Sequence, residues 1–230
     1  MADDPRGFDG AAAVTRSLLG YGVIAGGIYL AVGLTLALTR EGFDLAIHPL
    51  SLLMLGDGGW MQRANLILAG AMTIAAGVGI ARALREAERG RGVGPLVVVY
   101  GMCLVASGVF PPDAMAGFPP GAADDEASVA GILHLAFGAV GFLTLAVSAV
   151  LLGGWFGLRE ATGWAWASRA AGAVIVLAFM LGAALATSTV GVASLWLAVV
   201  AGWAWLAAIS VYLYRFVPHP DAERRAEQRA

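Results

Sequence analysis

The stretch from Ser128 to Trp155 reads SVAGILHLAFGAVGFLTLAVSAVLLGGW and contains no Asp, Glu, Lys or Arg. About 20 apolar residues suffice for a helix to cross a bilayer, so this stretch is long enough to span a membrane. Five further apolar stretches run from Ser17 to Thr39, Met61 to Leu84, Val93 to Phe110, Trp166 to Ser188 and Ala193 to Val217. Lipid offers no partner for unpaired backbone groups, and the period-two pattern of barrel strands is absent. The sequence therefore predicts an all-α, polytopic membrane protein with a bundle of six transmembrane helices.

Composition supports one membrane domain. Hydrophobic residues make up 59% of the chain and the mean hydropathy is +0.78, whereas soluble domains are only about 45 to 50% apolar. We expect residues 17–217 to form the transmembrane domain, flanked by an N-terminal segment, 1–16, and a C-terminal tail, 218–230. The chain contains no Lys, which excludes a retinal pigment held by a Schiff base. The single Cys103 excludes a disulfide framework and a CxxC metal site.

The arginines predict the orientation. Twelve of the fourteen lie before the first stretch, in or next to the connections from the second to the third and from the fourth to the fifth, or at or beyond the end of the sixth. Basic residues favour cytoplasmic loops, so both termini are predicted to be cytoplasmic. The absence of Lys and the abundance of Ala and Gly are typical of a high-GC bacterial genome, so the membrane is predicted to be a bacterial inner membrane. Only Arg40 and Arg63 fall on the opposite, outer side, where acidic residues are in excess. Aromatic residues near the predicted helix ends, among them Trp60 and Trp155, fit the belts at the two membrane surfaces.

Small residues spaced four apart predict close helix packing. This spacing occurs in three of the predicted helices, in the pairs Gly22 and Gly26, Ala75 and Gly79, and Gly182 and Ala186. It lets two helix backbones approach each other. We expect these faces to pack within the bundle, with a homodimer through the same faces as the alternative. Tyr100, Cys103 and Ser107 form a polar stripe that we also expect to pack against a neighbouring helix.

The two outer connections differ from the short, charged inner loops. Residues 40–60 and 110–126 are rich in Pro and Gly and partly apolar, which predicts ordered caps on the bundle. Leu50 to Leu55 are expected to form a short interfacial helix. Six polar residues lie in or just below these caps: His48, Asp57, Arg63, Asn65, Asp113 and His134. By the helical rise, Asn65 and His134 share a layer roughly 8 to 9 Å below the outer helix ends. Ionisable groups at such depths usually face protein or a cavity, so the six residues predict an outward-facing polar pocket.

Four segments carry a resemblance to a known family. They are His48-Pro-Leu-Ser-Leu-Leu, the segment from Gly56 to Gly70 containing Gly-Trp-Met-Gln-Arg-Ala-Asn, the segment from Gly108 to Pro119 containing Phe-Pro-Pro-Asp, and the downstream His134. In this combination the chain resembles the bacterial integral membrane protein family called domain of unknown function 998. The resemblance covers nearly the whole chain and implies a compact helical membrane protein, but the family has no established reaction. Ala114 departs from the family pattern, which more often has proline after the aspartate.

Three functions fit the polar layer. The first is binding of a membrane lipid or small amphiphile, with helix N-termini and Arg63 favouring an anionic head group. The second is a metal-assisted hydrolase or lipid-modifying enzyme at the outer leaflet, in which His48, Asp113 and His134 bind a divalent metal. In the third, these polar residues only fasten the outer loops through hydrogen bonds. The sequence leaves open whether the protein is an enzyme. It contains no cofactor motif and no pattern typical of nucleic-acid recognition.

Overall fold

In the computed structural model, which describes residues 8–122 and 127–222, the chain folds into six α-helices and one short 3-10 helix. The α-helices are α1 (Gly10–Thr39), α2 (Gly59–Ala83), α3 (Val93–Val109), α4 (Val129–Leu158), α5 (Thr162–Ala184) and α6 (Thr189–Phe216). The short helix η1 (Leu50–Met54) lies between α1 and α2. The predicted all-α class is confirmed. Four of the arginines that predict the orientation, Arg6, Arg224, Arg225 and Arg229, lie outside the described residues, as do the acidic residues 124–126.

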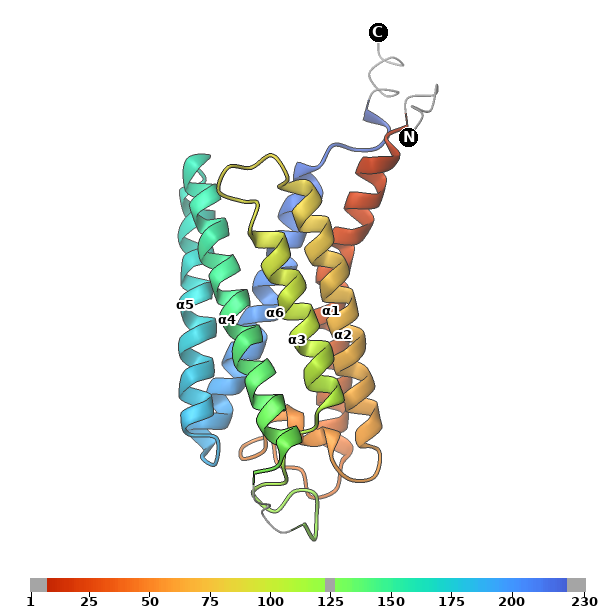
Figure 1. The fold of residues 1–230 in the computed structure, drawn as a ribbon, viewed down its shortest axis with the longest axis vertical. Coiled ribbons are helices and arrows are strands. Elements are labelled where there is room, and N and C mark those ends of the chain that lie inside the picture. Colours follow the sequence, from red (N-terminus) through yellow and green to blue (C-terminus); the bar gives the residue numbers. More distant parts are fainter. Residues whose placement is uncertain (1–7, 123–126, 223–230) are drawn as a thin grey trace.

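The six helices form a closed bundle (Figure 1). Each helix packs along its neighbours in sequence, and α6 returns against α1. Short connections at the end that holds both termini join α2 to α3 and α4 to α5. The N–H of Asp9 donates to the carbonyl oxygen of Pro220 at 2.9 Å, so the two described chain ends are in direct contact. The loops containing η1 and following α3 cover the opposite end of the bundle.

Capping residues determine where several helices begin. The side chains of Asp9, Ser128 and Ser188 accept hydrogen bonds from the backbone N–H groups of Ala12, Gly131 and Gly191, respectively. Each bond satisfies one of the first N–H groups of a helix, which have no partner within it. For this reason α1 begins at Gly10, before the predicted start at Ser17. Ser188, predicted to end the fifth span, instead begins α6, and α5 ends at Ala184.

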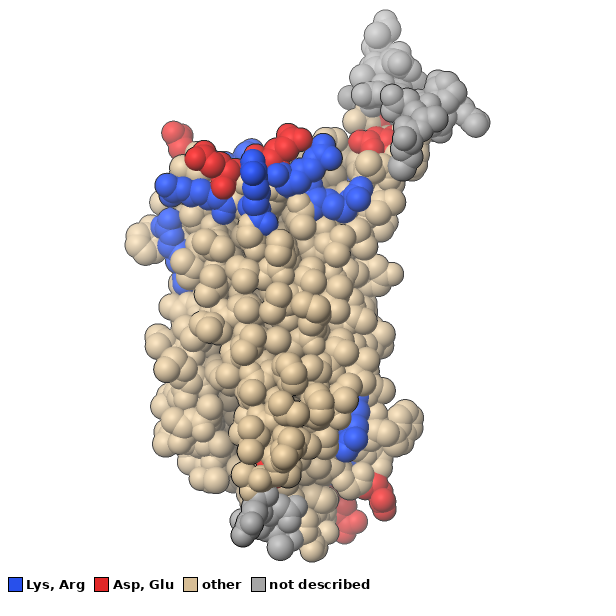
Figure 2. Space-filling model, in the orientation of Figure 1, with Lys and Arg blue, Asp and Glu red and all other residues tan. Residues whose placement is uncertain are grey.

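Hydropathy identifies the protein as a multi-pass membrane protein. Within the described ranges, α1, α2, α4, α5 and α6 are long and apolar enough to cross a membrane. The sixth helix, α3, is apolar but contains only 17 residues, or about 26 Å of helix at about 1.5 Å per residue. Figure 2 shows a largely uncharged band along the bundle, with most of the visible basic side chains at the end nearest the termini.

Glycines at seven-residue spacing bring α2 and α3 together. Gly70 and Gly77 of α2 face α3, whose glycines 94, 101 and 108 face α2. A Cβ atom on Gly70 would lie 2.7 Å from the carbonyl oxygen of Gly101, and one on Gly101 would lie 2.8 Å from that of Gly70. Such distances leave no room for a side chain, so this backbone contact depends on glycine.

The predicted packing of small residues within the bundle is confirmed. Gly26 of α1 faces α6, where an added Cβ atom would lie 2.9 Å from Cβ of Trp203. Gly22 contacts Ser210 of α6, and Gly182 of α5 packs against Leu195 of α6. These faces are therefore covered by other helices of the same chain.

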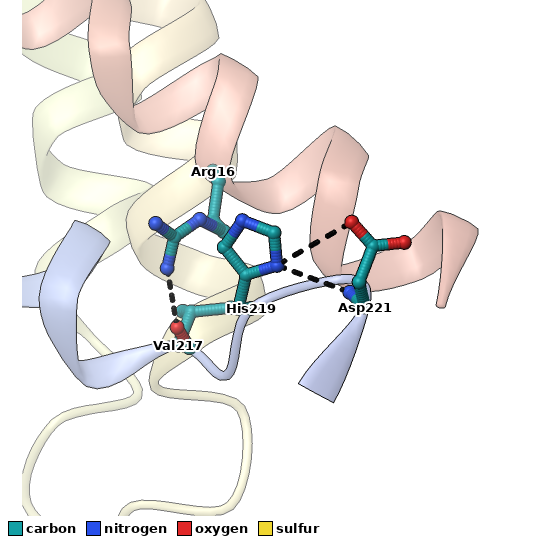
Figure 3. A network of polar contacts seen from close by, with 4 residues as sticks. All are labelled: Arg16, Val217, His219 and Asp221. Atoms are coloured by element: carbon teal, nitrogen blue, oxygen red, sulfur yellow. Dashed lines mark hydrogen bonds and ion pairs between the residues drawn. The ribbon is translucent and has the colours of Figure 1, made fainter. Parts of the chain in front are cut away.

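An arginine closes the bundle at the end nearest the termini, which we call the inner end. Pro218 has no N–H, so the carbonyl of Tyr214 lacks its donor from four residues ahead. Arg16 of α1 supplies the missing donor, because its Nη1 donates to the carbonyl oxygens of Tyr214 and Val217 at 2.7 Å each. Figure 3 shows Arg16 reaching Val217, beside a turn in which Nδ1 of His219 accepts the N–H of Asp221. The guanidinium group also lies 3.9 Å from the centre of the Tyr214 ring. Arg16 therefore joins α1 to α6.

Candidate functional site

The outer cap, residues 40–58 and 110–122, closes the other end of the bundle around η1. Leu52, Leu53 and Met54 are almost completely buried. The predicted short helix is therefore present, and it lies in the mouth of the bundle against α1 and α2.

Two arginines hold the C-terminal end of η1. Arg40 donates from Nη2 to the carbonyl oxygen of Leu55 at 2.8 Å, and Arg63 donates from Nε to that of Met54 at 3.2 Å. The last carbonyls of a helix lack internal partners and favour nearby positive charge. The Arg40 guanidinium also lies 5.7 Å from the centre of the Phe118 ring, in the second outer loop. The two arginines therefore fasten η1 to α1, α2 and the second loop.

His48 joins the two outer loops. Its Nδ1 accepts the N–H of Asp44 at 2.9 Å, and its Nε2 lies 3.0 Å from the carbonyl oxygen of Ala116. Because a carbonyl only accepts, Nε2 carries the proton and His48 is the neutral tautomer. The ring is buried against Phe43 and Phe118, with ring centres 5.3 and 5.4 Å away. Both nitrogens are used in the cap, so a metal would have to displace one of these hydrogen bonds.

Asp113 lies over the beginning of α4. Its carboxylate accepts hydrogen bonds from both the backbone N–H and the hydroxyl of Ser128. Ser128 in turn caps the helix by accepting the N–H of Gly131 at 3.0 Å. A negative charge beside a helix N-terminus is stabilising. Asp113 also borders an open depression on the outer cap, together with Gly56 and Pro119.

Asn65 connects α2 to α1 inside the bundle. Its Nδ2 donates to the carbonyl oxygen of Tyr29 at 3.1 Å and to Oε1 of Gln62 at 3.1 Å. The Tyr29 carbonyl can only accept, so it faces Nδ2 of Asn65, and the second hydrogen bond from Nδ2 directs Oε1 of Gln62 towards Asn65. The Gln62 side chain is therefore set by a backbone group of another helix.

His134 binds two carbonyls at the end of α3, one of which a proline leaves without a donor. Pro111 has no N–H to donate to the carbonyl of Ser107, four residues earlier. His134 of α4 lies with Nδ1 3.1 Å from the Ser107 carbonyl oxygen and 2.9 Å from that of Phe110. Nδ1 must carry the proton, because both partners only accept. This contact joins α4 to the end of α3.

The ring of His134 also lines a partly open cavity of about 290 Å³ in the outer half of the bundle. All six α-helices and η1 contribute to its wall. The wall is mainly apolar and aromatic, and includes Leu66, Leu104, Phe142, Phe179, Val199 and Trp203. Polar groups come from Tyr29, Gln62, Tyr100, Ser107 and His134. Drug-sized ligands usually occupy mostly apolar sites of roughly 300 to 1,000 Å³ with a few polar groups. This cavity lies near the lower limit, which favours a small ligand.

The structure separates the six residues predicted to line one pocket. Among them, His134 lies on the cavity wall and Asp113 borders the outer depression. His48, Arg63 and Asn65 are engaged in the contacts described above, and Asp57 is exposed on the loop before α2. Across residues 8–122 and 127–222, no three His, Cys, Asp or Glu side chains are grouped closely enough to hold a metal ion. The three predicted metal ligands, His48, Asp113 and His134, are thus not brought together.

Tyr100 and Cys103 pack against a neighbouring helix as predicted, because both contact the position of Gly141 on α4. Tyr100 also lines the cavity, as does Ser107. Gln62 was not predicted as a site residue. A signal for it exists in the sequence: Gln62 lies one helical turn before Asn65, so the two amides fall on the same face of α2.

One family model matches most of the chain. The family described as "Protein of unknown function (DUF998)" matches residues 23–212. The chain belongs to this family. The matched range includes the outer cap, α2 to α5 and the whole cavity wall. Searches of curated proteins and of solved structures found no match to this DUF998 chain.

Proposed function

We propose that this DUF998 protein binds one small lipid or amphiphile inside its helix bundle. The partly open cavity of about 290 Å³, with its apolar wall and a few polar groups, is the observation that carries this proposal. A chain of apolar groups gains about 25 cal/mol per Å² of surface removed from water. In a membrane, however, the alternative to binding is the lipid phase, so selectivity depends on shape and on the polar groups.

The membrane itself is the source of this ligand. Figure 1 shows α4 and α5 side by side near the inner end and diverging towards the outer end, where both line the cavity. Leu135 of α4 lies on the cavity wall and is 63% exposed. A ligand that passes between α4 and α5 would reach the cavity without crossing the outer cap.

The membrane topology proposed with this function has six spans and cytoplasmic termini in the bacterial inner membrane. The 17 residues of α3 are at the lower limit of about 17 residues for a spanning helix. Eight described arginines lie towards the inner end, whereas Arg40 and Arg63 lie at the outer end. The positive-inside rule then places the cavity in the outer half of the membrane. Cysteine labelling that found the loop at Asp113 accessible only from the cytoplasm would contradict this orientation.

A cavity-filling substitution tests ligand binding. A Cβ atom on Gly138 would lie 3.9 Å from the Phe179 ring, an ordinary contact, so Gly138→Leu would place its side chain in the cavity. Gly27→Leu is the matched control, because nothing lies within 4 Å of an added Cβ atom at this exposed site in α1. Each protein is purified in nanodiscs from bacterial membranes, and retained amphiphiles are counted by native mass spectrometry. We expect retention by the wild type and Gly27→Leu and its loss in Gly138→Leu. Equal retention by all three would overturn the proposal.

The contacts of the outer cap favour a second, structural function for the remaining polar residues. We propose that His48, Arg63 and Asp113 keep the cap closed over the bundle. Each of them makes hydrogen bonds to a loop or to a helix end. The cap then keeps water out of the cavity, whose polar groups form stronger hydrogen bonds in a dry environment.

A further inference from the structure

We infer that the ligand carries an uncharged hydroxyl group, which accepts from the amide of Gln62 and donates to Nε2 of His134. This inference rests on the proposed function and specifies the chemical class of the ligand, a lipid alcohol. It follows from how neighbouring backbone groups determine the hydrogen-bonding roles of these two side chains.

His134 offers an acceptor to the cavity. Its Nδ1–H is already directed at the carbonyl oxygens of Ser107 and Phe110. In the neutral ring the other nitrogen, Nε2, then has a lone pair and no proton. No described residue makes a hydrogen bond to Nε2 of His134, and the ring lines the cavity. A ligand group facing this nitrogen must therefore donate a proton.

Gln62 offers donors to the same cavity. Its Oε1 accepts from Asn65, and Asn65 is itself oriented by the Tyr29 carbonyl. The amide nitrogen of Gln62 therefore points away from Asn65, and within the described chain it has no hydrogen-bond partner. Gln62 is only 1% exposed and lies on the cavity wall. A ligand oxygen here could accept a hydrogen bond from this amide nitrogen.

Both side chains lie on the outer part of the cavity wall. Gln62 is in the first turn of α2, and His134 is six residues into α4, beside the last turn of α3. Below them the wall is aromatic, with Tyr100, Phe142 and Trp203. An amphiphile would accordingly hold its polar group under the outer cap and its hydrocarbon chain among the aromatic rings.

The cavity wall also lacks charge. No Asp, Glu, Lys or Arg is among the described residues that line it. Arg63 is the nearest arginine in sequence to Gln62, but its guanidinium binds Met54 and is not part of the wall. Burying an unpaired phosphate or carboxylate is strongly unfavourable, whereas a hydroxyl needs only a donor and an acceptor. The lining therefore favours an alcohol over an anionic head group.

Three probes with the same hydrocarbon chain test this inference: decanol, its methyl ether and decyl phosphate. The alcohol donates and accepts, the ether only accepts, and the phosphate is anionic. Occupancy is measured by native mass spectrometry from nanodiscs that contain equal mole fractions of each probe. We expect the wild type to bind decanol roughly five to ten times more tightly than the ether, the effect of one hydrogen bond, and decyl phosphate least.

Two variants assign the two hydrogen bonds. His134→Phe removes the acceptor, so decanol should bind no better than the ether. Gln62→Leu removes the donor to the ligand oxygen, so both probes should lose affinity while their ratio stays the same. The ratio is measured on one protein sample and does not depend on the folded fraction. If His134→Phe does not fold, the order of affinities of the three probes for the wild type and the effect of Gln62→Leu still test the inference.

The outcomes separate this inference from the proposed function. Tightest binding of decyl phosphate, or equal binding of decanol and its ether to the wild type, would overturn the inference while cavity binding stands. Binding of all three probes that is unchanged by Gly138→Leu would overturn cavity binding itself.

Discussion

In both the inner and the outer half of the bundle, a proline leaves a helix carbonyl without its N–H donor and a side chain from another helix supplies one, but the consequences differ. At the inner end Pro218 leaves the Tyr214 carbonyl without a donor and Arg16 supplies one; at the outer end Pro111 leaves the Ser107 carbonyl and His134 supplies one. The arginine is used entirely in closing the helix end and packing on an aromatic ring. The histidine has a second nitrogen, which remains available at the cavity. An arginine donor therefore only joins the helices, whereas a histidine donor also leaves a second ring nitrogen that can bind a ligand.

The two halves also differ in how the space between helices is filled. In the inner half the rings of Trp155, Phe156, Trp164 and Tyr212 pack against one another, with the centres of Phe156 and Tyr212 4.9 Å apart. Trp205 donates to Ser168 at 2.7 Å in the same half. The outer half contains the cavity instead. We therefore expect substitutions in the inner half to affect stability and those in the outer half to affect binding.

The largest loss of stability is expected when a side chain is added where two helix backbones are in contact. In Gly77→Leu the new Cβ atom would lie 2.7 Å from the backbone nitrogen of Val98, so α2 and α3 must separate. Overpacking of this kind costs about 3 kcal/mol or more when backbone must move. Gly138→Leu, which adds the same side chain in the outer cavity, should leave stability unchanged or raised. Thermal unfolding in mild detergent measures the stability of both variants. Similar losses of stability in the two would contradict the expected difference between the inner and outer halves.

A smaller loss of stability is expected when the contacts of Arg16 at the inner end are removed. Arg16→Ala removes two hydrogen bonds from a charged donor and the contact with the Tyr214 ring. We expect a loss of about 2 kcal/mol in the free energy of unfolding, with no change in ligand retention. Arg85→Ala is the control, since this side chain is 77% exposed beside Glu86 and its removal should change stability by less than about 0.5 kcal/mol. Loss of the bound amphiphile in Arg16→Ala would show that the halves are coupled.

Substitutions of Pro111 and His134 should have coupled effects on the free energy of unfolding, because both residues determine whether the Ser107 carbonyl has a donor. His134→Phe should cost about 1 kcal/mol because the Ser107 carbonyl loses its donor. In a Pro111→Ala background the new backbone N–H can donate to Ser107, so the same substitution should cost less. A double-mutant cycle measures this coupling. Additive effects would mean that His134 does not compensate for the proline.

The smallest effect is expected at the beginning of α4. Asp113→Asn removes a negative charge near the helix N-terminus but keeps an acceptor for Ser128, at a cost of about 0.5 kcal/mol. Asp57→Asn, on the exposed loop before α2, should have no measurable effect. Both are compared by thermal unfolding at low salt, where charge effects are largest. A cost at Asp57 as large as that at Asp113 would contradict the capping role.

Prediction from sequence succeeded for features that depend on local composition. The apolar stretches locate all six helices, and the small-residue pairs identify the packing of α1 against α6 and of α5 against α6. The prediction for Trp155 was wrong: it is buried in the inner aromatic cluster and is not a surface anchor like Trp60, which is 70% exposed. Both tryptophans lie near the end of an apolar stretch. Their difference depends on which side of the helix faces a neighbour.

The candidate site was predicted only in part for a related reason. Depth along a helix follows from the helical rise, so the sequence analysis placed Asn65 and His134 in one layer. The direction of a side chain depends on its partners. His48 is directed to Ala116, 68 residues away, and Asn65 to Tyr29, 36 residues away. Neither partner is recognisable from residue type, because both are backbone carbonyls.

The sequence by itself determined that this protein is an all-α, multi-pass membrane protein of the DUF998 family. Hydropathy and the spacing of motif residues can both be read along the chain without knowing which segments contact one another. Tertiary structure alone decided where the bundle is filled and where it is hollow. All six α-helices and η1 together line the cavity, and its polar groups are oriented by carbonyls on other helices. A void and a shared hydrogen bond are properties of several segments at once, so no single stretch of sequence contains them.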